Sequence, residues 1–369
     1  ALEAARKTIT LLKNDGNLLP IDPGTVRTVA VIGPNADRVM LGGYSGVPLH
    51  ASTVLQAIRE RAPAGVEVLY HEGCTLTIGG SWNQDEVVPS DPEEDRRGIR
   101  EAAALAARAD LVVLAIGDNE QTSREAWALN HMGDRASLDL FGRQDELVDA
   151  VAETGTPIAA VLFSGRPASI RNLAAKAGAI LEVWYLGQES GRAVAEVLFG
   201  DVNPGGKLPI SIPRSVGHVP AFYNHKPSAR RGYLFESSAP LFPFGFGLSY
   251  TRFALSAPRL DRDAIRVGES ARLSVEVTNT GPRAGDEVVQ LYVRDVVSST
   301  TRPVKELKGF RRVSLAPGET ATVTLDVTPD TLAFHGIDLG YRVEPGEFRL
   351  MVGSSSRDED LQSAVLRVE

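Results

Sequence analysis

One long segment of this sequence holds most of the side chains that could do chemistry. Between Gly117 and about Gly142 it carries Asp118, Glu120, Arg124, Glu125, Trp127, His131, Asp134 and Arg135. Segments this long without regular structure are uncommon in compact domains and are usually functional. A carboxylate beside an aromatic ring suits sugar chemistry, because the ring stacks on a sugar and its apolar surroundings raise the carboxyl pKa, so that the group can donate a proton.

The same residues also have simpler interpretations. A single glutamate in a loop is most often a solvated surface charge, Asp134 and Arg135 can form a local ion pair, and His131 can lie on the surface. Other kinds of catalytic site find no support, because the sequence contains no Gly-x-Ser-x-Gly elbow, phosphate loop or His-Glu-x-x-His helix. The glycines of LGGYSG (41–46) lack the spacing of a dinucleotide fingerprint. We therefore expect neither a metal nor a cofactor.

Composition narrows the choice of partners. The 369 residues include 39 basic and 47 acidic side chains, a net charge of −8, which argues against nucleic acid. The single cysteine, Cys74, excludes an internal disulfide framework. No apolar run approaches the ~18 residues of a membrane span, so we expect no membrane partner. With 43% hydrophobic residues, the chain is an ordinary globular protein of two or three domains.

The first part of the chain alternates strands and helices. Continuous apolar runs predict strands at 28–33, 66–70, 110–117, 157–163 and 179–187. Helical stretches fall near 52–62, 92–109, 143–154, 166–177 and 188–199, and residues 1–14 read as an opening amphipathic helix. The pattern predicts an α/β layer sandwich with a mostly parallel sheet. The long charged segment follows the third of these strands, and the carboxyl ends of such strands are where ligands bind.

The last part of the chain has a different pattern. Proline and glycine are frequent from 201 to 255, which we interpret as a connector with short edge strands. Beyond Ala257 apolar residues alternate with polar ones, as in Leu273, Val275 and Val277, and turn signals separate the runs. This predicts an all-β sandwich of the immunoglobulin or fibronectin type III kind. We place an α/β domain at 1–255, including the connector, and a fibronectin type III-like domain at 256–369.

Motifs along the whole chain resemble the C-terminal portion of glycoside hydrolase family 3, the β-glucosidase and β-xylosidase group. The resemblance begins at TITLLKNDGNLLPI, VAVIGPNAD and LGGYSG, and continues through GDNEQTSREAW and DVNPGGKLPISIPRSVGHVPAFYNHKP. It ends with LFPFGFGLSYTRF, VTNTGPRAGDEVVQLYVRD, KELKGFRRVSLAPGET and YRVEPGEFRLMVGSSS. The order of these motifs over essentially all 369 residues makes the match specific.

The resemblance implies a role for the charged segment. In this family an N-terminal (β/α)₈ barrel supplies the nucleophilic aspartate, and the α/β sandwich supplies the general acid/base from a loop that reaches over the barrel mouth. Carried over to SREAW, the acid/base is Glu125, with Glu120 as runner-up because this loop varies. Trp127, Arg124 and His131 would shape the leaving-group subsite. The implied activity is that of a retaining, exo-acting β-glycosidase on terminal β-linked glucose or related sugars.

The barrel is missing from this sequence, which leaves two readings. Either the chain works with a barrel from the same precursor or another chain, on a β-glucoside or short β-glycan, or it is a non-catalytic carbohydrate-binding or scaffold module. By itself we expect it to be folded but inactive, because retaining hydrolysis needs two carboxyl groups. Family habit favours the periplasm or secretion. The opening without an initiator methionine fits an excised piece or a mature N-terminus equally well.

Overall fold

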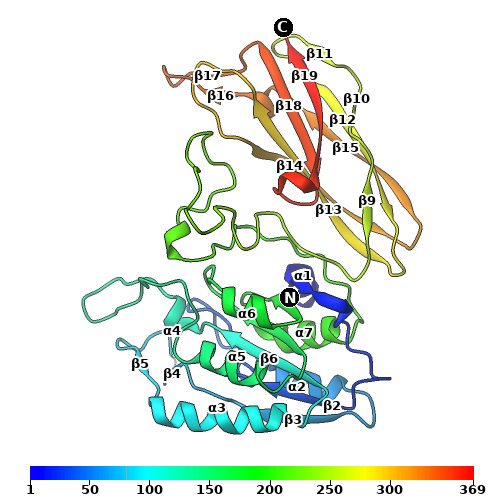
Figure 1. Ribbon diagram of the computed structural model, residues 1–369. Coiled ribbons are helices and arrows are strands. Elements are labelled where there is room, and N and C mark those ends of the chain that lie inside the picture. The colour runs from blue at the N-terminus through cyan, green and yellow to red at the C-terminus, as the bar shows by residue number, and fades with distance from the viewer. Residues whose placement is uncertain (80) are drawn as a thin grey trace. The chain divides into compact units, whose positions relative to one another are not determined.

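In the computed structural model, which describes residues 1–79 and 81–369, the chain forms two compact units, each with its own sheets (Figure 1). The first unit comprises Ala1–Gly206 and Ile212–Val219, and the second comprises Lys207–Ser211 and Pro220–Glu369. This division places residues 220–255 with the second unit, whereas the sequence pattern assigned them to the first domain. The domain boundary at residue 255 stays a prediction.

A six-stranded sheet forms the centre of the first unit. Its order is β1-β8-β7-β6-β2-β3, and every neighbouring pair is parallel except β1 and β8. The strands are β1 (Thr10–Asn14), β2 (Thr28–Ile32), β3 (Glu67–His71), β6 (Leu111–Gly117), β7 (Ile158–Phe163) and β8 (Ala179–Glu182). Strands β6, β7 and β8 are buried along their whole length, as their continuous apolar runs predict. A two-stranded ribbon, β4 (Thr77–Ile78) with β5 (Val88–Pro89), follows β3.

The helices of the first unit pack in two groups (Figure 1). Helix α7 (Ser190–Leu198) packs on α1 (Leu2–Thr8) and α2 (Val54–Arg61), whereas α5 (Gln144–Ala152) packs on α3 (Pro92–Ala106) and α6 (Arg171–Lys176). The chain winds outward from β2 to β3, and then returns through α3 to β6 on the other side of β2. The winding therefore reverses between β2 and β6, and the loops after these two strands flank the point where ligands bind in such sheets.

The sequence interpretation is wrong at the start of the chain. Residues 1–14 are not one helix: α1 ends at Thr8, and β1 begins at Thr10. The run Thr8-Ile9-Thr10 is β-branched and therefore favours an extended chain, and β1 pairs antiparallel to β8 at the edge of the sheet. A helix places Ile9 and Leu12 on one face, whereas a strand places them on opposite faces. Both are buried here, because the whole stretch 9–12 is buried, as in a strand covered on both faces.

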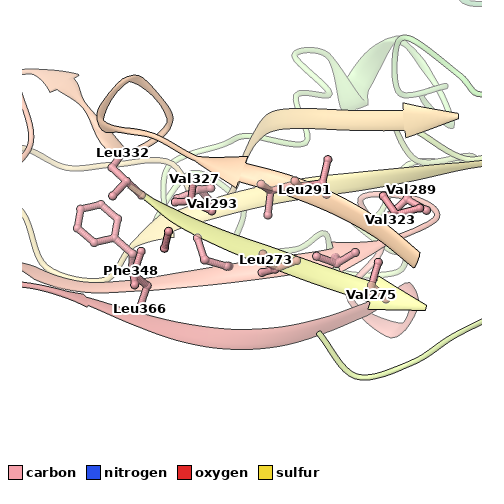
Figure 2. Packing of buried hydrophobic residues seen from close by; sticks show 14 of the residues in the cluster. Leu273, Val275, Val289, Leu291, Val293, Val323, Val327, Leu332, Phe348 and Leu366 are labelled. Atoms are coloured by element: carbon pink, nitrogen blue, oxygen red, sulfur yellow. The ribbon is translucent and has the colours of Figure 1, made fainter. Parts of the chain in front are cut away.

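Two packed sheets make up most of the second unit. One contains β10 (Arg259–Leu260), β12 (Ala271–Asn279) and β15 (Thr320–Val327), with β9 (Phe253–Leu255) also paired to β12. The other has the order β11 (Ala264–Ile265), β19 (Leu361–Val368), β18 (Gly346–Gly353), β13 (Gly285–Asp295) and β14 (Glu306–Leu315). A short helix, α8 (Pro329–Leu332), and the ribbon β16 (Phe334–His335) with β17 (Tyr341–Arg342) complete it. Alternating residues such as Leu273, Leu291 and Phe348 form the core (Figure 2).

The stretch between 201 and 252 is described throughout and contains no α-helix or strand, only a 3-10 turn at Val216–His218. Part of it packs on the outer side of β13 and β14. The Tyr223 ring stacks on Phe244 with centroids 4.2 Å apart and meets Tyr292 of β13 edge-on, while its hydroxyl accepts a hydrogen bond from the Leu307 amide. This packing explains why residues 220–252 belong with the second unit.

Candidate active site

The charged segment starts at the carboxyl end of β6. After Gly117 it forms one short helix, α4 (Glu120–Ser123), and then runs irregularly to α5. Asn119 caps α4, because its side-chain oxygen accepts hydrogen bonds from the amides of Gln121 and Thr122. The loop thus leaves the sheet beside β2, where the winding reverses.

A buried ion pair closes the base of the loop. The Asp118 carboxylate accepts a hydrogen bond from Arg135 Nη1 at 2.8 Å and one from the Thr122 hydroxyl at 3.2 Å. Burial raises the Asp118 pKa, and the Arg135 charge opposes that rise. Arg135 therefore pairs with Asp118 rather than with its neighbour Asp134. The pair therefore joins the first residues of the loop to Arg135 and closes residues 118–135 into one turn of chain.

Arg124 is buried, with 4% of its surface exposed. Its guanidinium donates hydrogen bonds of 2.5–2.8 Å to main-chain carbonyl oxygens of Met132, Trp82, Gln84 and Asp85. These bonds join the loop after β6 to residues 82–85 between β4 and β5. The structure thus shows Arg124 holding loops together, and contact with a leaving group stays a prediction for it.

Two further contacts hold the main chain around Glu125. Arg166, from the loop after β7, donates through Nη2 to the carbonyl oxygens of Ser123 and Arg124, both at 2.7 Å. Gly133 lies against the same stretch: a Cβ there would sit 2.5 Å from the Arg124 oxygen and 2.5 Å from the Glu125 carbonyl carbon. The backbone before and after Glu125 is therefore constrained from two directions.

The two candidate acids differ in their surroundings. The Glu125 side chain is exposed, and among the residues that the structure describes it has no hydrogen-bond or ion-pair partner. Glu120 is half-buried at the start of α4, and its Oε1 accepts a hydrogen bond from the Leu41 amide at 3.2 Å. One carboxylate is open to an incoming molecule, whereas the other is engaged by the loop after β2.

Four rings form a connected aromatic group, and one of them, Trp127, follows Glu125 by two residues. Trp127 meets His131 edge-on at 5.0 Å, His131 lies 5.6 Å from Trp82, and Trp82 lies 5.2 Å from Tyr44. Trp127 is 71% exposed, whereas His131 is 2% exposed and holds Asp85 through Nδ1 at 3.1 Å. Trp127 thus offers a ring face for stacking, while His131 supports it from below rather than facing solvent.

Sequence reasoning did not select several of these residues. Trp82, Asp85, Tyr44, Gly133 and Arg166 come from loops after four different strands. Tyr44 lies in LGGYSG and Arg166 lies in SGRP, and both segments follow predicted strands. Because ligands bind at the carboxyl ends of such strands, the sequence indicated these loops without selecting the two residues. Trp82 and Asp85 lie far from a predicted strand end, and nothing in the sequence connects them to Arg124.

Among residues 1–79 and 81–369, no group of three or more His, Cys, Asp or Glu side chains has the arrangement of a metal site. Within the same part of the chain, no helix combines the length and apolar character that crossing a membrane requires.

Comparison with protein families gives two matches. The glycosyl hydrolase family 3 C-terminal domain matches residues 9–250, and a fibronectin type III-like domain matches residues 287–356. The predicted order, a mostly parallel α/β sandwich followed by a fibronectin type III-like domain, is confirmed.

Individual relatives match the whole chain. A β-xylosidase of Formosa agariphila is 45% identical over 100% of this chain, and a periplasmic β-glucosidase of Salmonella typhimurium is 39% identical over 96% of it. The solved structure of the β-glucosidase EmGH1 of Erythrobacter marinus superposes with a TM-score of 0.96 at 44% identity, covering 100% of this chain. A Listeria innocua β-glucosidase, in complex with isofagomine, gives 0.86 at 33% identity. The chain covers only 48–50% of each of these proteins.

Proposed function

Since this chain belongs to glycoside hydrolase family 3, we propose that it supplies the general acid/base and the leaving-group subsite of a retaining, exo-acting β-glycosidase of the β-glucosidase type. The observation that carries the proposal is the exposed side chain of Glu125 on a constrained backbone, two residues before the exposed ring of Trp127. The chain spans about half the length of the relatives it matches, so the nucleophile would come from an N-terminal barrel.

In the first step, the barrel carboxylate would attack the anomeric carbon while Glu125 gives its proton to the glycosidic oxygen. The bond to the leaving group breaks, and a covalent glycosyl-enzyme remains. In the second step, the Glu125 carboxylate takes a proton from water as the water oxygen attacks the same carbon. This releases the sugar and returns both carboxyl groups to their first state.

The leaving group would lie on the aromatic group formed by Trp127, His131, Trp82 and Tyr44. Trp127 and Tyr44 are the most exposed of these rings, so they are suited to stack on a second sugar ring or an aryl group. The relatives named above include both β-glucosidases and a β-xylosidase. We therefore assign the choice of the terminal sugar, glucose or a related one, to the barrel.

The decisive experiment replaces Glu125 in the longer enzyme that carries a barrel. Glu125→Ala should slow hydrolysis of a β-linked disaccharide by roughly 10²–10⁴-fold, the usual contribution of positioned proton transfer. A dinitrophenyl glycoside, whose leaving group departs without a proton, should lose much less in its glycosylation step. Azide should restore part of the rate, because a small anion attacks the glycosyl-enzyme without a base.

Glu120→Ala is the matched control, since it removes the neighbouring carboxylate. If it shows the leaving-group dependence and Glu125→Ala does not, the acid/base is Glu120. Equal losses on both substrates without azide rescue would instead favour a non-catalytic loop and a carbohydrate-binding role.

We also propose that the protein acts in the periplasm or outside the cell. The Salmonella relative named above is described as periplasmic. Fractionating the native cells and detecting the protein with an antibody would test this, and recovery from the cytoplasm alone would contradict it.

A further inference from the structure

We infer that Arg166 and Arg124 are positioning residues for Glu125, acting through its backbone. The inference rests on the proposed function, because it explains how an exposed carboxylate can act as a precisely aimed acid. Neither arginine needs to touch the substrate. Arg166 would fix the peptide units that precede Glu125, and Arg124 would fix the turn from which Glu125 projects.

The first support is the direction of the hydrogen bonds. Both N–H groups on Arg166 Nη2 point at consecutive carbonyl oxygens, those of Ser123 and Arg124. The Arg124 oxygen belongs to the peptide bond that leads directly into Glu125. Two bonds from one planar group, one to each of two successive peptides, restrict the orientation of both peptides as well as their position. Because the Glu125 Cα is attached to this peptide, the orientation of the peptide restricts the direction in which the Glu125 side chain leaves the backbone.

The second support is the burial of Arg124. A buried guanidinium is costly unless its N–H groups find partners. Four N–H groups of the Arg124 guanidinium donate hydrogen bonds to main-chain carbonyl oxygens, those of Trp82, Gln84, Asp85 and Met132. No carboxylate is among these acceptors. The arrangement holds main chain on either side of the exposed stretch 125–130. A solvated surface glutamate would need no such support, whereas a general acid must be held within about 0.5 Å of its working position.

The third support is Gly133. A Cβ at this position would lie 2.5–2.8 Å from main-chain atoms of residues 124–126. The returning chain thus packs directly on the backbone of Glu125, with no side chain between them. Together with the arginines, it confines residues 124–126 from the β7 loop, from residues 82–85 and from the far side of the turn.

One test uses this 369-residue chain by itself. Arg166→Ala should raise the fast backbone mobility of Glu125 and Ala126, measured as a fall in their ¹⁵N order parameters, and leave those of the fibronectin type III-like domain unchanged. Arg59→Ala, on the exposed side of α2, is the matched control. Unchanged order parameters at Glu125 and Ala126 would overturn the inference, whatever the catalytic activity of the same variant in the longer enzyme.

The second test measures activity in the longer enzyme with its barrel. Arg166→Ala should lower kcat/KM for a disaccharide by about 10–100-fold and that for a dinitrophenyl glycoside much less. Arg166 is only half-buried, so free guanidinium at a non-denaturing concentration should enter its place and restore part of the disaccharide rate. Arg166→Lys, which retains one donor group, should fall between wild type and Arg166→Ala.

Outcomes separate the inference from the proposed function. If Glu125→Ala lacks leaving-group dependence, the proposed function fails. If Glu125→Ala shows it but Arg166→Ala behaves as wild type, or loses both substrates equally without guanidinium rescue, only the positioning role fails. Gly133→Ala tests the positioning role independently. Like Arg166→Ala, it should lower kcat/KM for a disaccharide more than kcat/KM for a dinitrophenyl glycoside. Gly309→Ala is its control, because the nearest atom to its added Cβ is 3.9 Å away.

Discussion

At the scale of single residues, the first unit contains a carboxyl group that titrates far from its usual range. Glu182 ends β8 with a fully buried side chain, and burial raises its pKa to about 8. Its Oε1 accepts hydrogen bonds from the Ser164 hydroxyl and the Trp184 amide. These bonds oppose the effect of burial without cancelling it. Glu182 is therefore protonated in the folded protein at neutral pH.

Glu182→Gln should remove a pH dependence of stability. Between pH 4.5 and 8 the folded state holds a proton that the unfolded state has lost, so the free energy of unfolding falls as pH rises through this window. Glutamine keeps the accepting oxygen and has no proton to lose. The variant should match the parent near pH 4 and exceed it by a few kcal/mol near pH 8 in urea unfolding. A gap of equal size at both pH values would contradict this. The control is Glu67→Gln, at the exposed first residue of β3.

His131 gives a second prediction at this scale. Because the buried ring contacts Trp82 and Trp127, His131→Ala should cost about 2 kcal/mol and increase acrylamide quenching of tryptophan fluorescence. His131→Phe retains the ring contacts and loses only the Asp85 bond, so its quenching should stay near that of the parent. Equal quenching of both variants would mean that Asp85, not the ring, holds the group together.

The candidate site was predictable from sequence only in part. The long segment after the 110–117 run and its mixture of carboxylates with tryptophan indicated where to look. The contacts that Arg124 and His131 make could not be predicted, because both side chains bind partners some 40 residues earlier in the chain, at residues 82–85. Sequence spacing describes neighbours along the chain, whereas these contacts arise where separate loops meet.

At the scale of elements, the carboxyl end of β6 requires a glycine. Gly117 has φ 135°, and a Cβ there would lie 1.8 Å from the carbonyl oxygen of Phe163 in β7. That oxygen also accepts the hydrogen bond of the Asp118 amide at 2.8 Å. The start of the candidate active-site loop and the pairing of β6 with β7 therefore depend on the same close approach.

Gly117→Ala should destabilise the first unit by about 2–4 kcal/mol, because it combines an unfavourable φ with a backbone clash. All three tryptophans, Trp82, Trp127 and Trp184, lie in this unit, so urea unfolding followed by their fluorescence reports on it alone. Gly217→Ala is the control, since its added Cβ meets only Ser215 Oγ, at 3.5 Å. Similar midpoints for the two variants would refute the argument.

Helices and strands were easiest to predict where the burial of the side chains follows one regular pattern along the whole element. The structure has strands at all five predicted places, and the alternating residues of β12, β13, β15 and β18 form the core of the second unit. The run predicted at 179–187 ends already at Glu182, because the chain turns at Trp184 with φ 52°. Such a turn depends on the buried Glu182 accepting the Trp184 amide, which no local pattern reveals.

At the scale of the whole molecule, the proposed chemistry divides between two polypeptide regions. Retaining hydrolysis places two carboxyl groups about 5–5.5 Å apart, on opposite sides of the bond that breaks. In this chain Glu125 has an exposed side chain, and Arg124 and Arg166 hold the backbone on which it stands. The nearby Glu120 is engaged by Leu41, and Asp118 by Arg135. Because these bonds already engage Glu120 and Asp118, we expect the attacking nucleophile to come from the barrel.

The 369-residue chain should therefore fold but not turn over aryl β-glucosides, even those with strongly activated leaving groups. An activated leaving group removes the need for an acid, but it does not replace the nucleophile, so no glycosyl-enzyme can form. Release of a fluorogenic aglycone should stay at the rate of buffer alone, while circular dichroism shows a folded protein. The longer enzyme with its barrel serves as the positive control. Turnover that follows the purified chain through gel filtration, and that Glu125→Ala reduces, would show that this half carries its own nucleophile.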